Sequence, residues 1–388
     1  MKALSYAIFL VGFLSYSQNK FSGIVVDADD KAPLEFVGIY NEKDRTLTNG
    51  DGKFLFSSSS DSIIFYRPGY EKLYTIFSKK QDTVYLNKSV LELNEVTVTN
   101  EKNIWQKVKD SLESNYTFQP YKEKFLVRGV LRYDGEITRI QDIQGKLLRK
   151  TLLYTEEIEP DKKDFTVEIT NMRKVGLERD ENNVYFIFDS FQGLFMNLIP
   201  MNATGDAFDL TESTLENGAK IKLNFKTLPS LENENSFGHY IINANNNAME
   251  RFYMVQEFNN RPFKEKSDAR YRTIKVEKVI SLKQAAKNRK YYIESAKYDI
   301  RVEVTDEHNS YTSYYDISFI MTTTDNEGDF EVKKNVSSAK DLFKINYPYN
   351  PNFWNAQNQL LLTDEMLRFI EKIQDPKNEF EIRSNMKN

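Results

Sequence analysis

Two runs of strictly alternating apolar and polar residues constrain the fold of this chain most. Residues 221–226 read Ile-Lys-Leu-Asn-Phe-Lys, and residues 300–305 read Ile-Arg-Val-Glu-Val-Thr. Because successive side chains of a β-strand point to opposite faces, each run predicts a strand with one apolar and one polar face. Further strands of the same sheet are predicted at residues 251–258, 273–280, 314–321 and 330–333. We therefore expect a large antiparallel sheet, strongly twisted and curled over one or two helices like a half-barrel.

The length and composition indicate a multidomain globular protein. The chain has 388 residues, enough for two or three domains that each bury a core. Aromatic residues make up 13% of the chain, and this share favours β structure. The chain carries 53 basic and 57 acidic residues, a formal net charge of −4. A nucleic-acid surface needs a basic excess on one face, so we expect no nucleic-acid partner.

The residue types that commonly bind metals are scarce. The chain has no cysteine, which excludes disulfides, thiolate metal ligands and cysteine nucleophiles. It has only two histidines, His239 and His308, and they are far apart in the sequence. Zinc sites built on two or three imidazoles therefore have almost no residues to use. We expect no metal site and no cofactor.

The first 17 residues have the three parts of a secretory signal. A basic start at Lys2 precedes an uncharged, largely apolar run, and Ser15-Tyr16-Ser17 supplies the small residues of a cleavage site. A membrane anchor is the alternative, but spanning a bilayer takes about 20 apolar residues. We expect cleavage after Ser17 and an exported protein that is periplasmic or associated with the outer membrane, or secreted, with no transmembrane span in the mature chain.

Short strands separated by turns dominate the next eighty residues. Turn residues recur every eight to twelve positions, a spacing that favours a β-sandwich over a parallel α/β sheet. Asn49-Gly50-Asp51-Gly52 is the clearest hairpin signal, because these residue types adopt positive φ at little cost. Strands are predicted at residues 22–27, 35–40, 53–56, 62–66, 70–77, 83–86 and 91–99.

Five segments of this region resemble the carboxypeptidase regulatory-like domain. They are residues 23–27 (Gly-Ile-Val-Val-Asp), 33–37 (Pro-Leu-Glu-Phe-Val), 48–54 (Thr-Asn-Gly-Asp-Gly-Lys-Phe), 61–65 with Gly69-Tyr70, and 93–98 (Leu-Asn-Glu-Val-Thr-Val). The resemblance implies a transthyretin-like seven-strand β-sandwich of the kind common in exported Bacteroidetes proteins. It implies no carboxypeptidase activity, because the chain has no His-x-x-Glu pair to bind a metal.

These observations predict three parts: a signal peptide at residues 1–17, the β-sandwich at 18–99, and a body of antiparallel sheet with flanking helices at 100–388. The alternating run Leu93–Thr99 would join the sandwich to the body. Apolar residues at positions 104, 108 and 112 predict an amphipathic helix over residues 102–114. Thr363 is expected to cap a last helix that ends before Pro376.

The segment 347–354 has the most unusual local composition of the body. Tyr347, Tyr349, Phe353 and Trp354 alternate with prolines and asparagines. Aromatic faces can stack on sugar rings while amides bind hydroxyl groups, so these four residues are candidate ligand-binding residues. The alternative is that the segment wraps an open edge of the sheet, with prolines fixing an extended path.

The residue types present favour a binding role over catalysis. No Gly-x-Ser-x-Gly motif presents a serine nucleophile, so catalysis would have to rely on carboxylates. We therefore expect a non-enzymatic cell-envelope protein in which the sandwich docks on a partner protein and the curved sheet binds a partner, a glycan or an apolar ligand. The alternative is a carboxylate-based glycan hydrolase that carries the sandwich as an accessory.

Overall fold

The structure is a computed structural model that describes residues 19–79, 81–89, 91–92, 103–154, 161, 163–178, 189–200, 207–216, 218–228, 234–266, 269–306, 310–374, 381–384 and 386. The predicted signal peptide and the junction Leu93–Thr99 lie outside these residues. The chain divides into two compact units. Unit 1 runs to Lys88 and includes Gln357–Thr363, and unit 2 comprises Ser89–Ala356 and Asp364–Asn388.

The described residues of unit 1 form a seven-strand β-sandwich, as predicted for this region. The strand predicted at residues 91–99 is not one of the seven, because its described part, Leu91–Glu92, pairs with Thr214–Leu215 of unit 2, and a strand at Arg45–Leu47 is present instead. One sheet has the order β4-β1-β7, in which β1 pairs with β7 in parallel and with β4 antiparallel. The other sheet has the order β3-β2-β5-β6 and is antiparallel. The strands are β1 (Asn19–Asp27), β2 (Gly38–Tyr40), β3 (Arg45–Leu47), β4 (Lys53–Ser58), β5 (Ser62–Tyr66), β6 (Leu73–Ile76) and β7 (Thr83–Leu86), and the short helix η1 (Phe77–Lys79) follows β6.

The core of unit 1 is built on aromatic rings. The rings of Phe21 and Phe54 meet edge to face with 4.9 Å between their centroids, and Phe65 packs on both. The predicted hairpin turn at residues 49–52 requires glycine at its last position. Gly52 has φ = +71°, and a Cβ there would lie 2.5 Å from the carbonyl oxygen of Val25. Only glycine fits this turn.

A segment from the far end of the chain completes unit 1. The Thr46 hydroxyl donates a hydrogen bond to the carbonyl of Asn358 at 2.7 Å, and the Asn49 side chain donates one to the carbonyl of Leu362 at 3.0 Å. Residues 357–363, predicted as part of the body, belong to unit 1 instead. Contacts across more than 300 residues leave no local pattern in the sequence, so this segment had no signal to reveal it.

The Asp27 carboxylate ties together three segments of unit 1. It accepts hydrogen bonds from the Asp29 N–H at 2.8 Å and from the Tyr70 hydroxyl at 2.8 Å, and Lys88 Nζ lies 3.1 Å away. Burial alone would raise the pKa of Asp27, but these interactions outweigh it and lower the pKa to about 2. The folded sandwich therefore prefers the ionised carboxylate.

We expect Asp27→Asn to remove part of the acid sensitivity of unit 1. The folded-state pKa lies below the unfolded value of about 3.9, so this contribution to stability is complete above about pH 4 and is lost as the pH falls through about 2. Hydrogen exchange of the β1 amides should show opening that rises more steeply with acid in the wild type than in the variant. Equal pH slopes would contradict the assignment.

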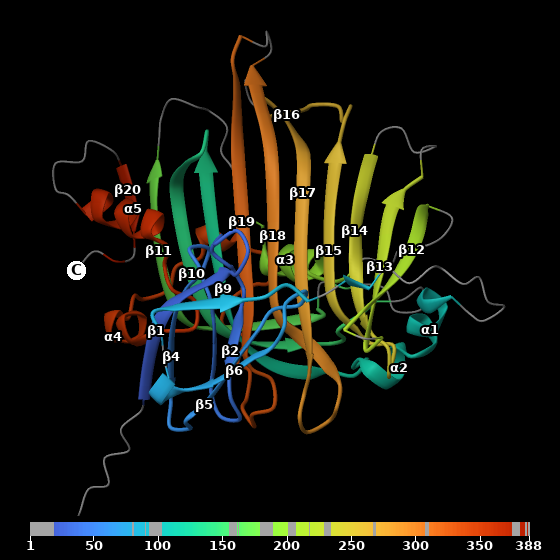
Figure 1. Ribbon diagram of the computed structural model, residues 1–388. Helices are drawn as coiled ribbons and strands as arrows, with labels where there is room; N and C mark the ends of the chain where they lie inside the picture. Colours follow the sequence, from blue (N-terminus) through green and yellow to red (C-terminus); the bar gives the residue numbers. More distant parts are fainter. Residues whose placement is uncertain are drawn as a thin grey trace, which may run out of the picture. The chain divides into compact units, whose positions relative to one another are not determined.

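The described residues of unit 2 form one thirteen-stranded antiparallel sheet, as predicted for the body (Figure 1). Its order is β20-β11-β10-β9-β19-β18-β17-β15-β14-β13-β12-β8, with β16 paired to β17. The strands are β8 (Leu91–Glu92), β9 (Tyr121–Tyr133), β10 (Glu136–Arg149), β11 (Phe165–Glu178), β12 (Phe208–Leu215), β13 (Lys220–Thr227), β14 (Glu234–Asn243), β15 (Met249–Phe258), β16 (Lys264–Lys266), β17 (Ala269–Gln284), β18 (Tyr291–Asp306), β19 (Thr312–Asp325) and β20 (Glu381–Ser384).

The strand predicted at residues 330–333 is wrong. This segment has no ladder partner in the described sheet, and side chains bind its backbone instead. Lys122 Nζ donates a hydrogen bond to the Phe330 carbonyl at 2.9 Å, and the Lys333 N–H donates one to Glu168 at 2.7 Å. With these groups satisfied, the segment crosses the sheet without joining it.

One face of the sheet carries the core of unit 2. In α3, Phe191, Leu194 and Phe195 are fully buried, and the Phe195 ring packs on Phe125 of β9. At the other end of the sheet, Trp105 of α1 packs on Tyr240 of β14. The helices of this unit are α1 (Ile104–Asp110), α2 (Leu112–Asn115), α3 (Phe191–Asn197), η2 (Leu342–Lys344), α4 (Pro351–Ala356) and α5 (Asp364–Gln374).

The opposite face is covered at β9–β11 and encloses an ion cluster. Arg128 donates to Asp142 through Nε and Nη2 at 2.7 and 3.1 Å, and Arg173 Nε donates to the same carboxylate at 3.1 Å. Arg128 and Asp142 are no more than 2% exposed. Burial alone would raise the pKa of Asp142, but the two guanidinium groups hold it below its usual value. Trp354 of α4 packs against Arg173, and Glu365 of α5 binds Arg132.

We expect Asp142→Ala to be strongly destabilising. It leaves two cations without their shared carboxylate under α4 and α5, and breaking a buried pair in this way costs about 3–5 kcal/mol. Urea unfolding followed by tryptophan fluorescence measures the loss, because both tryptophans belong to unit 2. The matched control is Glu331→Ala, which removes an 82% exposed carboxylate and should leave the midpoint unchanged. Similar effects of the two variants would show that the cluster is not structural.

Candidate functional site

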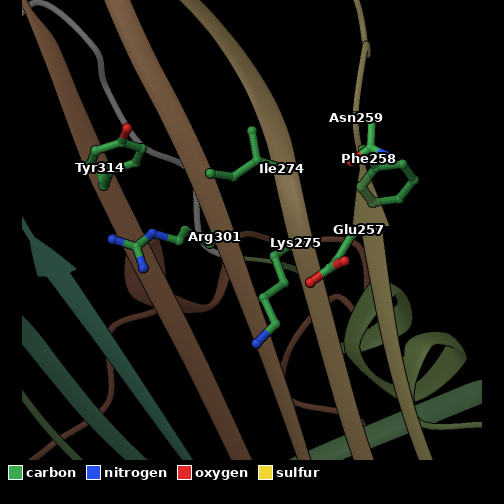
Figure 2. A pocket seen from close by; sticks show the side chains of 7 residues that line it. All are labelled: Glu257, Phe258, Asn259, Ile274, Lys275, Arg301 and Tyr314. Carbon is green, nitrogen blue, oxygen red and sulfur yellow. The ribbon is translucent and has the colours of Figure 1, made fainter. Parts of the chain in front are cut away.

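The candidate site is a groove on the sheet face opposite the core, over β15, β17, β18 and β19 (Figure 2). Its volume is about 590 Å³. Charged, aromatic and amide side chains line it together. They are Glu257, Phe258, Asn259, Ile274, Lys275, Arg301 and Tyr314.

A β-bulge in β17 shapes the floor of this groove. The pairing of β17 with β18 shifts between Thr273 and Lys275, so Ile274 is an extra residue without a partner in that ladder. A bulge lets consecutive side chains leave the strand on the same face. Ile274 and Lys275 therefore both line the groove, as Figure 2 shows.

The strand register places four charges in a row across the sheet. Glu257 pairs with Lys275, Lys275 with Arg301, and Arg301 with Asp316. The two cations are thus direct cross-strand neighbours at the centre of the groove. Like charges in such a position repel each other, so this arrangement favours an anion between them.

Nearby acids only partly offset the two cations. Lys275 Nζ lies 3.1 Å from Glu277, and Arg301 Nε lies 3.6 Å from Asp316. The Lys275 and Arg301 side chains are 43% and 48% exposed, and ion pairs so open to water are weak. The Arg301 guanidinium also lies over the Tyr314 ring, 4.8 Å from its centroid. Both cations remain accessible to a ligand.

A second hollow of about 220 Å³ continues the groove along the sheet. It shares Lys275 and Arg301 with the first, so the cation pair lies where the two hollows meet. Glu277 and Asp299, which line it too, are cross-strand partners. Asp299 also accepts a hydrogen bond from the Ser318 hydroxyl, and Lys297 Nζ lies 3.6 Å from it.

The four aromatic residues predicted from sequence lie outside this groove. Trp354 is 5% exposed, with its ring against the Arg173 guanidinium at 4.8 Å and next to the Phe353 ring at 5.0 Å. Tyr347 is partly buried and packs against the core cluster of unit 2. Tyr349 and Phe353 are partly buried as well. Their role in ligand binding stays a prediction, but the position of Trp354 is that of an anchor for α4.

We expect Trp354→Ala to destabilise unit 2 by roughly 3 kcal/mol, as large aromatic truncations do in cores. The loss has two sources, the buried indole surface and its contact with Arg173. Leu367→Ala on α5 is the control, because Leu367 is 43% exposed and its loss should change stability little. Guanidinium unfolding of both variants measures the difference. A wild-type midpoint for Trp354→Ala would return this residue to the candidate ligand-binding surface.

Asp189 and Asp341 have raised pKa values, and both have structural partners. Burial raises the pKa of Asp189, and the nearby charge of Asp341 raises it further. Asp189 accepts hydrogen bonds from the Ser190 N–H and the Asn197 side chain, and Asp341 caps η2 by accepting one from the Phe343 N–H. These acids hold α3 and η2 in place. Within the described residues, no group of three or more His, Cys, Asp or Glu could hold a metal ion.

The comparisons with known proteins add little to this geometry. No protein-family model matches the chain, and a search of curated proteins finds no match. Among solved structures, one described as "Lipid-protein interactions in lipovitellin" is similar to this chain at 9% sequence identity and a TM-score of 0.23. The match covers 64% of this chain and 30% of the lipovitellin chain. At so low a TM-score the likeness supports no conclusion about fold or function. In the described part of the chain, no helix has the length and apolar character to cross a membrane.

Proposed function

We propose that this protein is a non-enzymatic binding protein of the cell envelope whose groove takes an acidic saccharide. The observation that carries the proposal is the cross-strand pair Lys275 and Arg301 at the centre of the groove. Among the residues lining the larger hollow, these two cations face one acid, Glu257. A carboxylate or sulfate group of a ligand between the cations would relieve their repulsion and accept hydrogen bonds from both.

The rest of the lining suits a sugar ring. Tyr314 offers an aromatic ring beside the Arg301 guanidinium, on which the C–H groups of a pyranose can stack, whereas the Phe258 ring lies under the Arg261 guanidinium at 4.5 Å. Asn259 offers both a donor and an acceptor for hydroxyl groups. The second hollow beyond the cation pair is also lined by Glu277, Asp299 and Asp316, so it suits the hydroxyl groups of a further sugar unit and not its carboxylate. A groove open along a sheet suits a linear chain better than a compact ligand.

The N-terminal part of the proposal rests on the sequence. The carboxypeptidase regulatory-like resemblance and the predicted signal support export to the periplasm or outer membrane, with unit 1 as the docking module for an envelope protein. The seven-strand sandwich agrees with the fold that this family implies. Unit 2 would then hold the glycan while unit 1 fixes the protein in place.

Isothermal titration with oligogalacturonides of defined length tests the binding site. The wild type should bind them more tightly than neutral malto-oligosaccharides, and salt should weaken the binding. Lys275→Ala, Arg301→Ala and Tyr314→Ala should each weaken binding about tenfold, the loss of one charge-assisted bond or one stacked ring. Arg368→Ala and Tyr74→Ala remove exposed residues elsewhere and serve as matched controls. Equal affinity for acidic and neutral chains, or equal loss in the controls, would refute the site.

Hydrolysis is a second candidate because Glu277 and Asp299 are direct cross-strand partners in the smaller hollow. Directly opposite residues have their Cβ atoms about 5 Å apart, so the two side chains can bring their carboxylates to the roughly 5 Å separation of a retaining glycosidase. Incubation of the same oligosaccharides with wild type and with Glu277→Gln separates the two functions. Release of new reducing ends by the wild type alone would establish catalysis, whereas intact chains in both samples favour the binding role.

A further inference from the structure

Four polar side chains meet at one end of β9 and β10 without completing their hydrogen bonds. The unpartnered atoms are Nε and Nη2 of Arg149, Oε1 of Glu123, and the hydroxyl oxygens of Tyr121 and Tyr154, all of them buried. Arg149 and Glu123 are no more than 1% exposed. Buried polar atoms almost always have hydrogen-bond partners in folded proteins. Five such atoms close together therefore indicate a site where a ligand supplies the partner.

Arg149 presents the edge that arginine uses to bind carboxylates. Elsewhere in unit 2, Arg128 donates through Nε and Nη2 to Asp142 at 2.7 and 3.1 Å, and Arg132 uses the same two atoms for Glu365 at 3.4 and 2.6 Å. The same edge of Arg149 has no acceptor. Its nearest acid is Glu123, whose Oε1 lies 3.7 Å from Nη2 and outside hydrogen-bonding range.

Aromatic packing fixes the orientation of this edge. The Arg149 guanidinium lies over the rings of Phe165 and Phe195, 5.6 and 5.4 Å from their centroids. Stacking on ring faces leaves the in-plane N–H groups free to point elsewhere. The other oxygen of Glu123 lies 3.4 Å from the Thr323 hydroxyl, which donates its shorter hydrogen bond, at 2.6 Å, to the Ile293 carbonyl. The two charges are therefore positioned close together but not paired edge to edge.

The two tyrosines add donors on the same site. Tyr121 is the cross-strand partner of Arg149, and Tyr154 lies close to both Arg149 and Asp164. Guanidinium and phenol groups give this site more donors than acceptors. Both tyrosines are only partly buried as whole residues, so the site lies just below the protein surface.

We propose that Arg149, Tyr121 and Tyr154 form a binding site for a small carboxylate, separate from the groove on the other face of the sheet. The two oxygens of the carboxylate accept from Nε and Nη2 of Arg149, and the two phenol hydroxyls donate to its remaining lone pairs. Phe165 and Phe195 lie beside the guanidinium and suit the short apolar part of such a ligand.

Acetate is the probe for this site, with chloride at equal ionic strength as the reference and inorganic phosphate as the second oxyanion. Acetate should raise the melting temperature of the wild type and bind with measurable heat in calorimetry. Arg149→Lys keeps the positive charge but loses the paired Nε and Nη2 donors, so its affinity for acetate should fall about tenfold or more. Binding of phosphate but not acetate would overturn the assignment to carboxylates.

Tyr121→Phe and Tyr154→Phe make the proposal testable even if Arg149→Lys fails to fold. Each removes only a hydroxyl and keeps the ring, so the acetate-free variants should fold and lose little stability. Both should nevertheless bind acetate more weakly, whereas Tyr74→Phe at a 68% exposed position should change neither property. Unchanged acetate binding in both variants, or an acetate effect no larger than that of chloride, would overturn the proposal.

Discussion

The strict alternation of side chains along a continuous antiparallel ladder determines most of this structure. The thirteen paired strands among the described residues of unit 2 direct every second side chain to one face, where apolar side chains pack against α1 and α3. The polar residues must then share the other face. At β9–β11 that face is covered by α4 and α5, and at β15–β19 it carries the charged groove. A single ladder thus produces both a buried ionic cluster and an open binding surface.

The same residue types have different roles in these two places because their exposure differs. Asp142 shares its carboxylate between two arginines in a region almost closed to water, where each pairing is strong and specific. Lys275 and Arg301 are about half exposed, and their ion pairs with neighbouring acids contribute little to stability. Because the charges of Lys275 and Arg301 contribute little to the stability of the fold, they are available to bind a ligand. The groove, and not the buried ion cluster, is therefore the candidate site.

The sequence predicted the parts of this structure that depend on local pattern. The run at residues 300–305 placed Arg301 on the polar face of a strand, and the turn at residues 49–52 marked the sandwich. The groove itself depends on which strands are neighbours and on the bulge at Ile274, and neither leaves a local signature. Trp354 illustrates the same limit, because its composition suggested a surface platform and its partner, Arg173, is 181 residues away in the sequence.

Covalent footprinting of lysines with and without an oligogalacturonide tests the account most directly, since it reports which face the ligand covers. Acetylation at Lys275 should fall strongly when the saccharide is present, while Lys340 and Lys122, exposed residues that do not line the groove, should react as before. Protection at those two lysines with Lys275 unaffected, or no protection of any lysine at saturating saccharide, would contradict the claim that this sheet face is the binding surface.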